Sequence, residues 1–501
     1  MMTSDCSNMV PVQSRAARIA RFAGVVSVAS AVALVALPAV SPASATAPAA
    51  AAAVNDAPKR MMSGWLPYWT TQASVDAVVQ NADLFSDISP FWHNAAKSSS
   101  SPSGVTIQNN SLSSGSRASN LATLRGRGIA ILPSITDGTG TGYMSAAMRN
   151  GAKRAALVSQ IVNLVTSNGY DGIDLDFEKF AFSDGQSTWA ATRPAWVAFV
   201  AALGAQLHAR GKKLAVAVPP MGVPGNNYWV YDFAGMAPHI DKLRIMAYDY
   251  SWSSPGPIGG PLSWVEQVAA YAVSVVPPSK VQLGTPTYGR DWVKGTSGSG
   301  CPSTSQKVYD SKQIGSVINN TPASSWKRDA ASLERYFNYT VTYGSCVVSR
   351  SAWVPDAVTV AERARIASKY GLAGIATWTI GGEQSSQWGT LRTIAKTMPF
   401  SAPDGPRSQR LTYKVKSKTG KKGRTVTISG GVAPARSGAA VRLQVKRGSK
   451  WVTLKGVKTG GAGTYKITIK QNAKKSVYRV RAAGTARFLA RNSSSFTVRA
   501  G

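Results

Sequence analysis

The chain has 501 residues, with 57 Lys and Arg against 23 Asp and Glu, so its formal net charge at pH 7 is +34. This length exceeds one ordinary domain, although a single barrel can take about 250 residues or more. Only three Cys and three His occur, and none has the spacing of metal ligands, so we expect no dedicated zinc site and no cofactor.

The positive charge is unevenly distributed along the chain. No acidic residue follows Asp404, whereas 24 Lys and Arg residues do. Residues 1–47 carry a net charge of +2, which leaves +8 for residues 48–404. The high isoelectric point therefore belongs to the C-terminal part.

Residues 1–47 have the pattern of a signal peptide. A basic segment precedes the apolar run Phe22–Val40, and the small residues Ala43-Ser44-Ala45 and Ala45-Thr46-Ala47 follow as cleavage candidates. The alternative is a membrane anchor, because the run is just long enough to span a bilayer, but Pro38 and the small residues favour cleavage. We expect a secreted, extracellular protein that keeps no membrane span and associates with the cell wall.

Residues 48–59 are rich in Ala and Pro and are expected to form a disordered linker. From residue 60 to 400, short apolar runs alternate with longer amphipathic stretches, which predicts a parallel (β/α)8 barrel. The predicted strands are Gly64–Trp69, Ile88–Trp92, Ile129–Ile135, Gly172–Phe177, Lys213–Val218, Lys242–Tyr248, Lys280–Tyr288 and Gly371–Trp378.

In such a barrel the chemistry collects at the C-terminal ends of the strands. The predicted ends are rich in aromatic and polar side chains, among them Tyr68, Trp92, Tyr248, Arg290 and Trp378. Aromatic rings stack on the C–H faces of sugars, so these ends indicate a carbohydrate groove. Taken singly, each aromatic residue is more often part of a core.

The stretch Tyr170–Phe180 reads Y-D-G-I-D-L-D-F-E-K-F. Side chains alternate along a strand, so Asp174, Asp176 and Glu178 share one face. Three acids in a row repel one another and are costly to bury. The row is expected to line a cleft with one carboxyl group held protonated, as a general acid for a glycosidic bond requires. The alternative is a polar strand whose acids face solvent.

These residues resemble the catalytic domain of glycoside hydrolase family 18. Asp171, Asp174, Asp176 and Glu178 fit the family's D-x-x-D-x-D-x-E motif. Three later segments fit too, in the family's order: Met246-Ala247-Tyr248-Asp249, Tyr288-Gly289-Arg290 and the strand that ends at Trp378. The resemblance implies a barrel that hydrolyses β-linked N-acetylglucosamine polymers.

The sequence departs from the typical chitinases of that family. Phe177 stands where many chitinases have Trp, and Leu132–Thr136 lacks the usual S-x-G-G. Segments such as Met246–Trp252 and Val281–Trp292 are more similar to the branch of spore-cortex-lytic glucosaminidases. The substrate is therefore open between chitin and the glycan strand of peptidoglycan, and between endo and exo action.

The resemblance also implies a mechanism, in which the substrate's own 2-acetamido oxygen attacks the anomeric carbon and gives retention. Glu178 is then the acid, Asp176 orients the acetamido group, Asp174 shares a proton with Asp176, and Tyr248 bonds the acetamido oxygen. The expected substrate-binding residues are Tyr68, Trp92, Met246, Asp249, Tyr288, Arg290 and Trp378.

Two alternatives use the same residues differently. Some family members bind glycans without cleaving them, and others release asparagine-linked glycans from glycoproteins. The intact Asp176 and Glu178 favour catalysis over a purely lectin-like role, whereas no motif excludes the endoglycosidase.

The connection from Asp291 to Tyr370 is longer than a normal barrel loop. The resemblance implies a small α+β insertion there, and Arg335–Tyr339 and Val347-Val348 are strand candidates. Cys301 and Cys346 both lie in it. An even pair in an exported chain predicts a disulfide, with two free buried thiols as the alternative.

After a linker at 401–410, residues 411–501 show seven short alternating runs separated by glycine-rich turns, which predicts an immunoglobulin-like β-sandwich. Its basic, acid-free composition favours binding to an anionic cell-wall polymer. No nucleic-acid motif occurs, so nucleic acid is not expected as a partner, and a soluble spacer is the alternative. We expect a monomer.

Overall fold

The fold comes from a computed structural model that describes residues 57–110, 112–225, 227–303, 306–313, 326–485 and 487–500. The predicted signal peptide, and the predicted linker up to residue 56, lie outside the described residues. Within the described part, no helix is both long and apolar enough to cross a bilayer.

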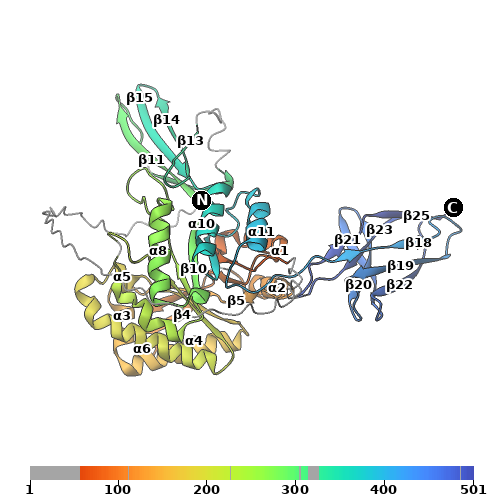
Figure 1. The fold of residues 1–501 in the computed structure, drawn as a ribbon, viewed down its shortest axis with the longest axis horizontal. Helices are drawn as coiled ribbons and strands as arrows, with labels where there is room; N and C mark the ends of the chain where they lie inside the picture. Colours follow the sequence, from red (N-terminus) through yellow and green to blue (C-terminus); the bar gives the residue numbers. More distant parts are fainter. Residues whose placement is uncertain are drawn as a thin grey trace, which may run out of the picture. The chain divides into compact units, whose positions relative to one another are not determined.

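A curled sheet forms the centre of the catalytic part (Figure 1). Its eleven strands follow the order β4-β3-β6-β7-β8-β9-β10-β16-β1-β2-β5, and only β3 and β4 pair antiparallel. The strands are β1 (Met62–Leu66), β2 (Asp87–Pro90), β3 (His93–Lys97), β4 (Val105–Asn109), β5 (Ala130–Ile131), β6 (Ser134–Asp137), β7 (Gly172–Asp176), β8 (Lys213–Val218), β9 (Lys242–Ile245), β10 (Val281–Pro286) and β16 (Gly374–Trp378).

This sheet confirms a fold of the TIM-barrel type and corrects the expected strand count. The predicted third strand is divided into β5 and β6, with Pro133 between them, where the chain lacks an N–H donor. β5 pairs with β2, and β6 pairs with β3 and β7, so this single stretch joins two distant parts of the curled sheet. The hairpin of β3 and β4 adds two further strands.

Helices follow most of the parallel strands and cover the outer face of the sheet. The longer ones are α1 (Thr71–Gln80), α2 (Ser114–Arg125), α3 (Tyr143–Arg149), α4 (Gly151–Ser167), α6 (Trp189–His208), α8 (Leu262–Val275), α10 (Ala357–Lys369) and α11 (Gln387–Thr397). Side chains cap the N-terminal ends of two of these helices. Asn150 caps α4 by accepting from the Lys153 N–H, and Asp356 forms a capping box with Thr359 at α10.

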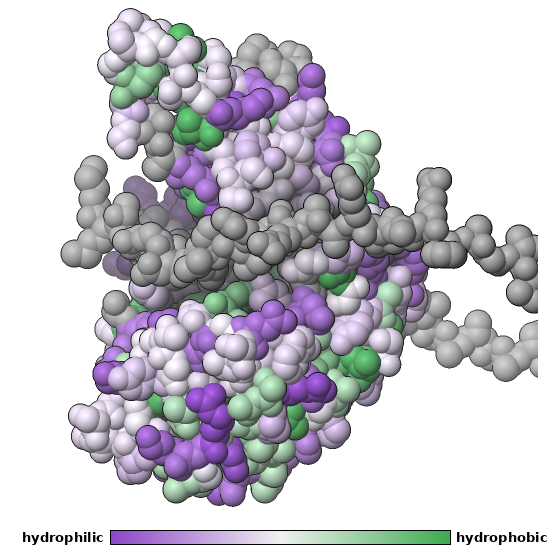
Figure 2. All heavy atoms as spheres, turned by 90° about the vertical axis from the view of Figure 1, so that its left-hand side faces the viewer, coloured by the Kyte–Doolittle hydropathy of each residue, from purple (hydrophilic) through white to green (hydrophobic). Residues whose placement is uncertain are grey.

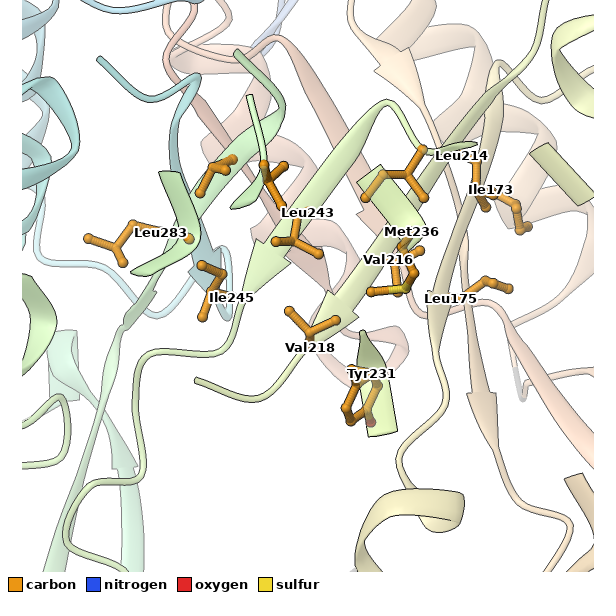
Figure 3. Packing of buried hydrophobic residues seen from close by; sticks show 14 of the residues in the cluster. Ile173, Leu175, Leu214, Val216, Val218, Tyr231, Met236, Leu243, Ile245 and Leu283 are labelled. Atoms are coloured by element: carbon orange, nitrogen blue, oxygen red, sulfur yellow. The ribbon is translucent and has the colours of Figure 1, made fainter. Parts of the chain in front are cut away.

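The two faces of the parallel strands have opposite character. Ile173, Leu175, Leu214, Val216 and Leu243 come from neighbouring strands and are fully buried in the core between sheet and helices (Figure 3). Burying each such side chain contributes about 1.5–3 kcal/mol. The alternate positions of β7 therefore project toward the inside of the curled sheet. On the face shown in Figure 2, hydrophilic and hydrophobic residues are interspersed over the described surface.

Between β10 and α10 lies a separate antiparallel sheet, with the order β12-β11-β15-β14-β13. Its strands are β11 (Tyr288–Ser297), β12 (Lys307–Asp310), β13 (Lys327–Arg328), β14 (Arg335–Tyr343) and β15 (Cys346–Val354). The predicted disulfide between Cys301 and Cys346 is confirmed, with an S–S distance of 2.06 Å. Both predicted strands fall in β14 and β15. The described part is antiparallel sheet with one short 3-10 turn, η6 (Ser311–Gln313), where an α+β subdomain was expected.

The C-terminal residues form two antiparallel sheets. One contains β17 (Arg410–Leu411), β18 (Lys414–Lys416), β19 (Thr425–Ala433) and β22 (Thr464–Lys470). The other contains β20 (Ala440–Arg447), β21 (Lys450–Lys458), β23 (Lys475–Ala482), β24 (Arg491–Asn492) and β25 (Phe496–Arg499). Buried residues of both sheets, such as Ile428 and Leu443, belong to one hydrophobic cluster. Two sheets around one core agree with the predicted immunoglobulin-like sandwich.

Candidate active site

The acidic strand β7 places its carboxylates on the inner face of the curled sheet. Asp174 and Asp176 are buried, and Glu178 follows the strand directly, at the start of the short helix α5 (Lys179–Phe182), where it is half-buried. Gly172 allows β7 to approach β8 closely, because a Cβ there would lie 2.2 Å from the Lys213 carbonyl oxygen. The acids therefore extend from the interior of the barrel toward the C-terminal end of the strand.

Asp174 is anchored as a carboxylate by three donors to its Oδ2. Trp65 Nε1 lies at 2.8 Å, Ser134 Oγ at 3.0 Å and an Arg244 guanidinium nitrogen at 2.9 Å. Arg244 is fully buried and also bonds Asp87 and Ser89. Asp174 thus sits in a buried ion network that holds its negative charge in place.

Sequence analysis did not single out Arg244. The available signal was a charged residue inside the apolar run of β9, at a position whose neighbours Leu243 and Ile245 face the helices. A charge on the inner face of a barrel strand needs a partner, and the acids of β7 provide it.

Asp176 lies where the charged form of its carboxyl group is disfavoured. Burial raises its pKa well above the usual range, and the charges of Glu178, Asp174 and Asp137 raise it further. Its Oδ1 is buried and has no hydrogen-bond partner among the described residues.

Glu178 has the protonation behaviour of a general acid near neutrality. Burial raises its pKa to about 7, and the charges of Asp249 and Asp137 contribute in the same direction. An acid with this pKa is largely protonated at slightly acidic pH and can still release the proton in the reaction.

Asp137 is a further acid of the cluster, at the end of β6, and sequence analysis did not include it among the site residues. It follows Thr136, which pairs with Asp176 on β7. Its Oδ1 accepts from the Thr139 N–H at 3.0 Å and the Thr139 hydroxyl at 2.7 Å, while its buried Oδ2 has no partner within the described residues. Burial raises the pKa of Asp137 despite the bonds from Thr139. The signal for it was its position at the C-terminal end of a predicted strand.

Tyr248 and Asp249 follow β9, which ends at Ile245, after Met246 and Ala247. Burial, followed by the charges of Asp176 and Glu178, keeps the pKa of Tyr248 well above its usual range, so its hydroxyl remains a neutral donor. Asp249 Oδ1 accepts from the Tyr288 hydroxyl at 2.5 Å and from Arg290 at 2.7 Å. Asp249 also has a positive φ of 55°.

Tyr288 and Arg290 belong to the inserted sheet. β10 ends at Pro286, and β11 begins at Tyr288. This corrects the expectation that these residues end the seventh barrel strand. Through Asp249, the inserted sheet is joined to the barrel residues beside the acids.

An aromatic cluster lies around Trp378 at the end of β16. Its ring centroid is 4.8 Å from that of Phe91, 6.0 Å from Trp65 and 6.4 Å from Trp69, and Tyr68 contacts Trp69 at 4.9 Å. Trp378 is half-buried, and 58% of the surface of Trp69 is exposed. Open ring faces beside an acidic cluster suit the stacking of sugar rings.

Trp92 does not join this cluster, contrary to the expectation for it. It is 1% exposed and packs in the main core, with its ring 6.2 Å from that of Tyr170. The preceding residue, Phe91, contacts Trp378 instead. Met246 is half-buried at the end of β9, next to the segment that carries Tyr248. Among the described residues, no group of His, Cys, Asp and Glu is arranged to hold a metal.

Comparison with known families agrees with this arrangement of acids and aromatic rings. The sequence profile described as glycosyl hydrolases family 18 matches residues 67–383, more than half of the chain. The chain belongs to glycoside hydrolase family 18. The matched range contains the acids of β7, Tyr248, Trp378 and the inserted sheet.

Curated relatives within family 18 include glycosylases of sporulating bacteria. A putative sporulation-specific glycosylase of Bacillus subtilis is 26% identical over 270 residues, 51% of this chain and 58% of the relative. A cortical fragment-lytic enzyme of Bacillus anthracis is 25% identical over 255 residues, 49% of this chain and 55% of the relative. The chain thus spans a little over half the length of these two relatives.

Among solved structures, the chain is similar to a chitinase from Chromobacterium violaceum. The TM-score is 0.56 at 25% sequence identity, and the match covers 66% of this chain and 98% of that chain. The family therefore includes both chitinases and cortex-lytic enzymes among the proteins this chain is similar to.

Proposed function

We propose that this family 18 glycoside hydrolase cleaves β-1,4 bonds in N-acetylglucosamine polymers, chitin or the glycan strands of peptidoglycan, with retention of configuration. The observation that carries the proposal is the pair at the end of β7: Glu178 with a pKa of about 7, near a buried Asp176 whose pKa is raised well above its usual range. A proton donor adjacent to a hydrogen-bonding acid is what substrate-assisted hydrolysis needs.

In the proposed mechanism, Glu178 protonates the leaving glycosidic oxygen while the acetamido oxygen of the same sugar attacks the anomeric carbon. Asp176 bonds the acetamido N–H and stabilises the oxazolinium ion that forms. The Tyr248 hydroxyl donates to the acetamido oxygen and aims it. Glu178, now ionised, then removes a proton from the water that opens the oxazolinium.

The remaining residues position the substrate. Trp378 stacks beneath the sugar at the cleavage point, and Trp69 and Tyr68 extend that aromatic surface. Asp249, held by Tyr288 and Arg290, bonds a sugar hydroxyl or acetamido group at the wall formed by the inserted sheet. No second carboxylate nucleophile is required.

The proposal is tested by incubating the protein with chitooligosaccharides, colloidal chitin, purified peptidoglycan and an N-glycosylated protein, and by analysing the products by mass. We expect cleavage of at least one of the two polymers, with the β-anomer formed first. Tight binding without any product would favour the lectin-like alternative. Release of N-glycans alone would favour the endoglycosidase.

One observation favours the peptidoglycan strand over chitin as substrate. A hollow of about 500 Å³ is lined by Lys97, Lys153, Tyr143 and several serines, and its lining, which is made of described residues, contains no Asp or Glu. The Lys97 ammonium lies 4.5 Å from the centre of the Tyr143 ring. Two cations in one hollow suit a carboxylate, which the peptide stems of peptidoglycan carry and chitin lacks.

The strand register gives the backbone separation between Lys97 and the acids of β7. Thr136 pairs with Asp176 and with Asn94, so Lys97 lies two strands away from Asp176 and three residues further along. Strand spacings of about 4.8 Å and a rise of about 3.3 Å per residue give roughly 14 Å between the two residues. This backbone separation corresponds to a few sugar rings, and the odd offset puts the Lys97 side chain on the face of the sheet opposite Asp176.

We therefore expect Lys97→Gln/Lys153→Gln to raise KM on soluble peptidoglycan fragments and to leave KM on chitooligosaccharides unchanged. The matched control is Lys212→Gln/Lys213→Gln, which removes two charges at the opposite end of β8. Equal effects on both substrates would contradict a carboxylate-binding role for the hollow.

Export is proposed on the sequence of residues 1–47. Expression of the full chain and of a form that lacks these residues, followed by detection in the culture medium, tests it. Retention of both forms inside the cell would contradict export.

A further inference from the structure

The second C-terminal sheet presents a row of cations on its outer face. Along β20, Val441, Leu443 and Val445 are buried in the sandwich core, so the alternate side chains point to solvent. The same alternation on β23 and β25 turns Tyr478, Val480 and Val498 inward. The cations turned outward form what we call the arginine face: Arg442, Lys446, Lys475, Arg479, Arg481 and Arg499.

Two pairs of like charges lie directly opposite one another on this face. Arg442 pairs in register with Arg481, and Lys475 pairs with Arg499. Like charges in such positions destabilise a sheet. No carboxylate side chain is present after Asp404 to neutralise them. Beside the first pair, burial and then the charge of Arg481 lower the pKa of Arg479.

Part of the arginine face is held in a fixed geometry. The Arg479 guanidinium donates through Nε to Gln444 Oε1 at 2.8 Å, and lies 4.5 Å from the centre of the Trp451 ring. A fixed guanidinium loses less side-chain entropy on binding than a free one. The face is thus charged and partly preorganised.

The other sheet of the sandwich has cations arranged differently. Lys414, Lys466 and Lys470 also follow the outward positions of their strands, but β19 lies between β18 and β22 and turns Thr425, Thr427 and Ser429 outward. No two of these lysines face each other in register. This sheet therefore provides cations without directly opposed pairs.

We propose that the arginine face binds a linear polymer of phosphodiester units, independently of the catalytic site. Neighbouring strands set the cations about 4.8 Å apart, and alternate residues along one strand set them about 6.7 Å apart. The two non-bridging oxygens of a phosphodiester diverge from a tetrahedral centre, so one phosphate can accept from both guanidinium groups of an opposed pair. Binding removes the repulsion between Arg442 and Arg481.

The same face is poorly suited to nucleic acid. Proteins that bind single strands stack the bases on open aromatic rings. The aromatic ring beside the arginine face is that of Trp451, and Arg479 already lies over it. A phosphate polymer without bases can pair with the cations of the arginine face and needs no aromatic surface for stacking.

The test measures binding of the full chain to an immobilised synthetic glycerol-phosphate oligomer across a series of salt concentrations. Arg442→Gln/Arg481→Gln is compared with Lys466→Gln/Lys470→Gln, since each double variant removes two charges. We expect the arginine variant to lose at least about tenfold in affinity. The negative slope of log K against log salt should become shallower by about two. The lysine variant is expected to lose less than about threefold.

Equal losses in the two variants would overturn the proposal, because net charge alone would then explain binding. So would tighter binding of the wild type to single-stranded DNA or to polyglutamate of equal charge. Arg442→Lys/Arg481→Lys keeps the charge and serves if the glutamine variant does not fold. It is expected to bind more weakly than the wild type, and wild-type affinity in it would contradict a role for the guanidinium groups.

Discussion

Glu178 differs from an ordinary surface glutamate because its surroundings disfavour the charged form. Burial is the main cause, and Asp249 and Asp137 add negative charge on two sides. The spacing of the acids on one strand was predictable from the sequence, since alternation puts every second residue on one face. The pKa value of Glu178 was not predictable, because it depends on burial and on acids from other strands.

Replacement Glu178→Gln is expected to lower kcat by about 10³-fold or more while the fold is kept, because the amide cannot donate the catalytic proton. Turnover on the preferred glycan, together with circular dichroism, measures both effects. Wild-type-like turnover would contradict the assignment of Glu178 as the acid.

Asp137→Asn is expected to shift the pH dependence of the reaction. Its negative charge raises the pKa values of Glu178 and Asp176. Glu178 must be protonated to act, so removing the charge lowers its pKa and moves the alkaline limb of the kcat/KM profile to lower pH.

The control for this shift is Asp171→Asn, before the start of β7, where the carboxylate accepts from the Ile131 N–H. The Asp171→Asn variant should leave the alkaline limb of the kcat/KM profile unchanged. An unshifted limb in Asp137→Asn would show that this acid does not influence Glu178.

At the scale of elements, strand β9 shows what sequence patterns leave out. The pattern placed a strand there and put Tyr248 near its end, and both agree with the structure. It did not assign a function to Arg244, because apolar alternation describes only the helix-facing side of the strand. The acidic partners of Arg244 come from β7 and β2, which are 70 and 157 residues away in the sequence. Long-range pairing of this kind does not show in local spacing.

Arg244→Met is expected to lower the free energy of unfolding by about 3–5 kcal/mol, because it leaves Asp174 and Asp87 buried with fewer partners. Urea denaturation measures the change. Lys280→Met, which removes a cation bonded only to the Ala237 carbonyl, is the matched control and should cost less. A change below about 1 kcal/mol in Arg244→Met would mean that the network contributes little.

Trp92 is a residue for which the sequence pattern predicted a sugar contact that the structure does not have. Its position at a predicted strand end suggested contact with sugar, yet β2 stops at Pro90 and the chain turns into β3. This turn exposes Phe91 to the aromatic cluster and buries Trp92. A shift of one residue reverses the face on which a side chain lies.

For the whole molecule, several buried acids make stability depend on pH. The pKa values of Glu178, Glu334 and Glu383 are each raised to about 7 in the folded state, in every case mainly by burial. Between about pH 4.5 and 7 the folded chain therefore binds more protons than the unfolded chain, and these groups make stability fall as pH rises. His93, whose pKa is lowered to about 4 by burial, acts in the opposite direction, but it is a single group.

We expect the free energy of unfolding to decrease from pH 5 to pH 7, as measured by urea titration at several pH values. The Glu383→Gln variant should show a smaller decrease in the free energy of unfolding with pH, because it removes one of the three groups whose pKa burial raises. The Oε1 of Glu383 is buried without a partner among the described residues. A stability that rises across this range would show that His93 outweighs the acids with raised pKa values.

The positive φ of Asp249 has a consequence for experiments on the groove. Left-handed backbone is tolerated by asparagine and glycine and is unfavourable for alanine. Alanine scanning at this position would therefore mix a conformational penalty with the loss of the carboxylate, and would overstate its contribution to sugar recognition. Asparagine is the replacement that isolates the charge.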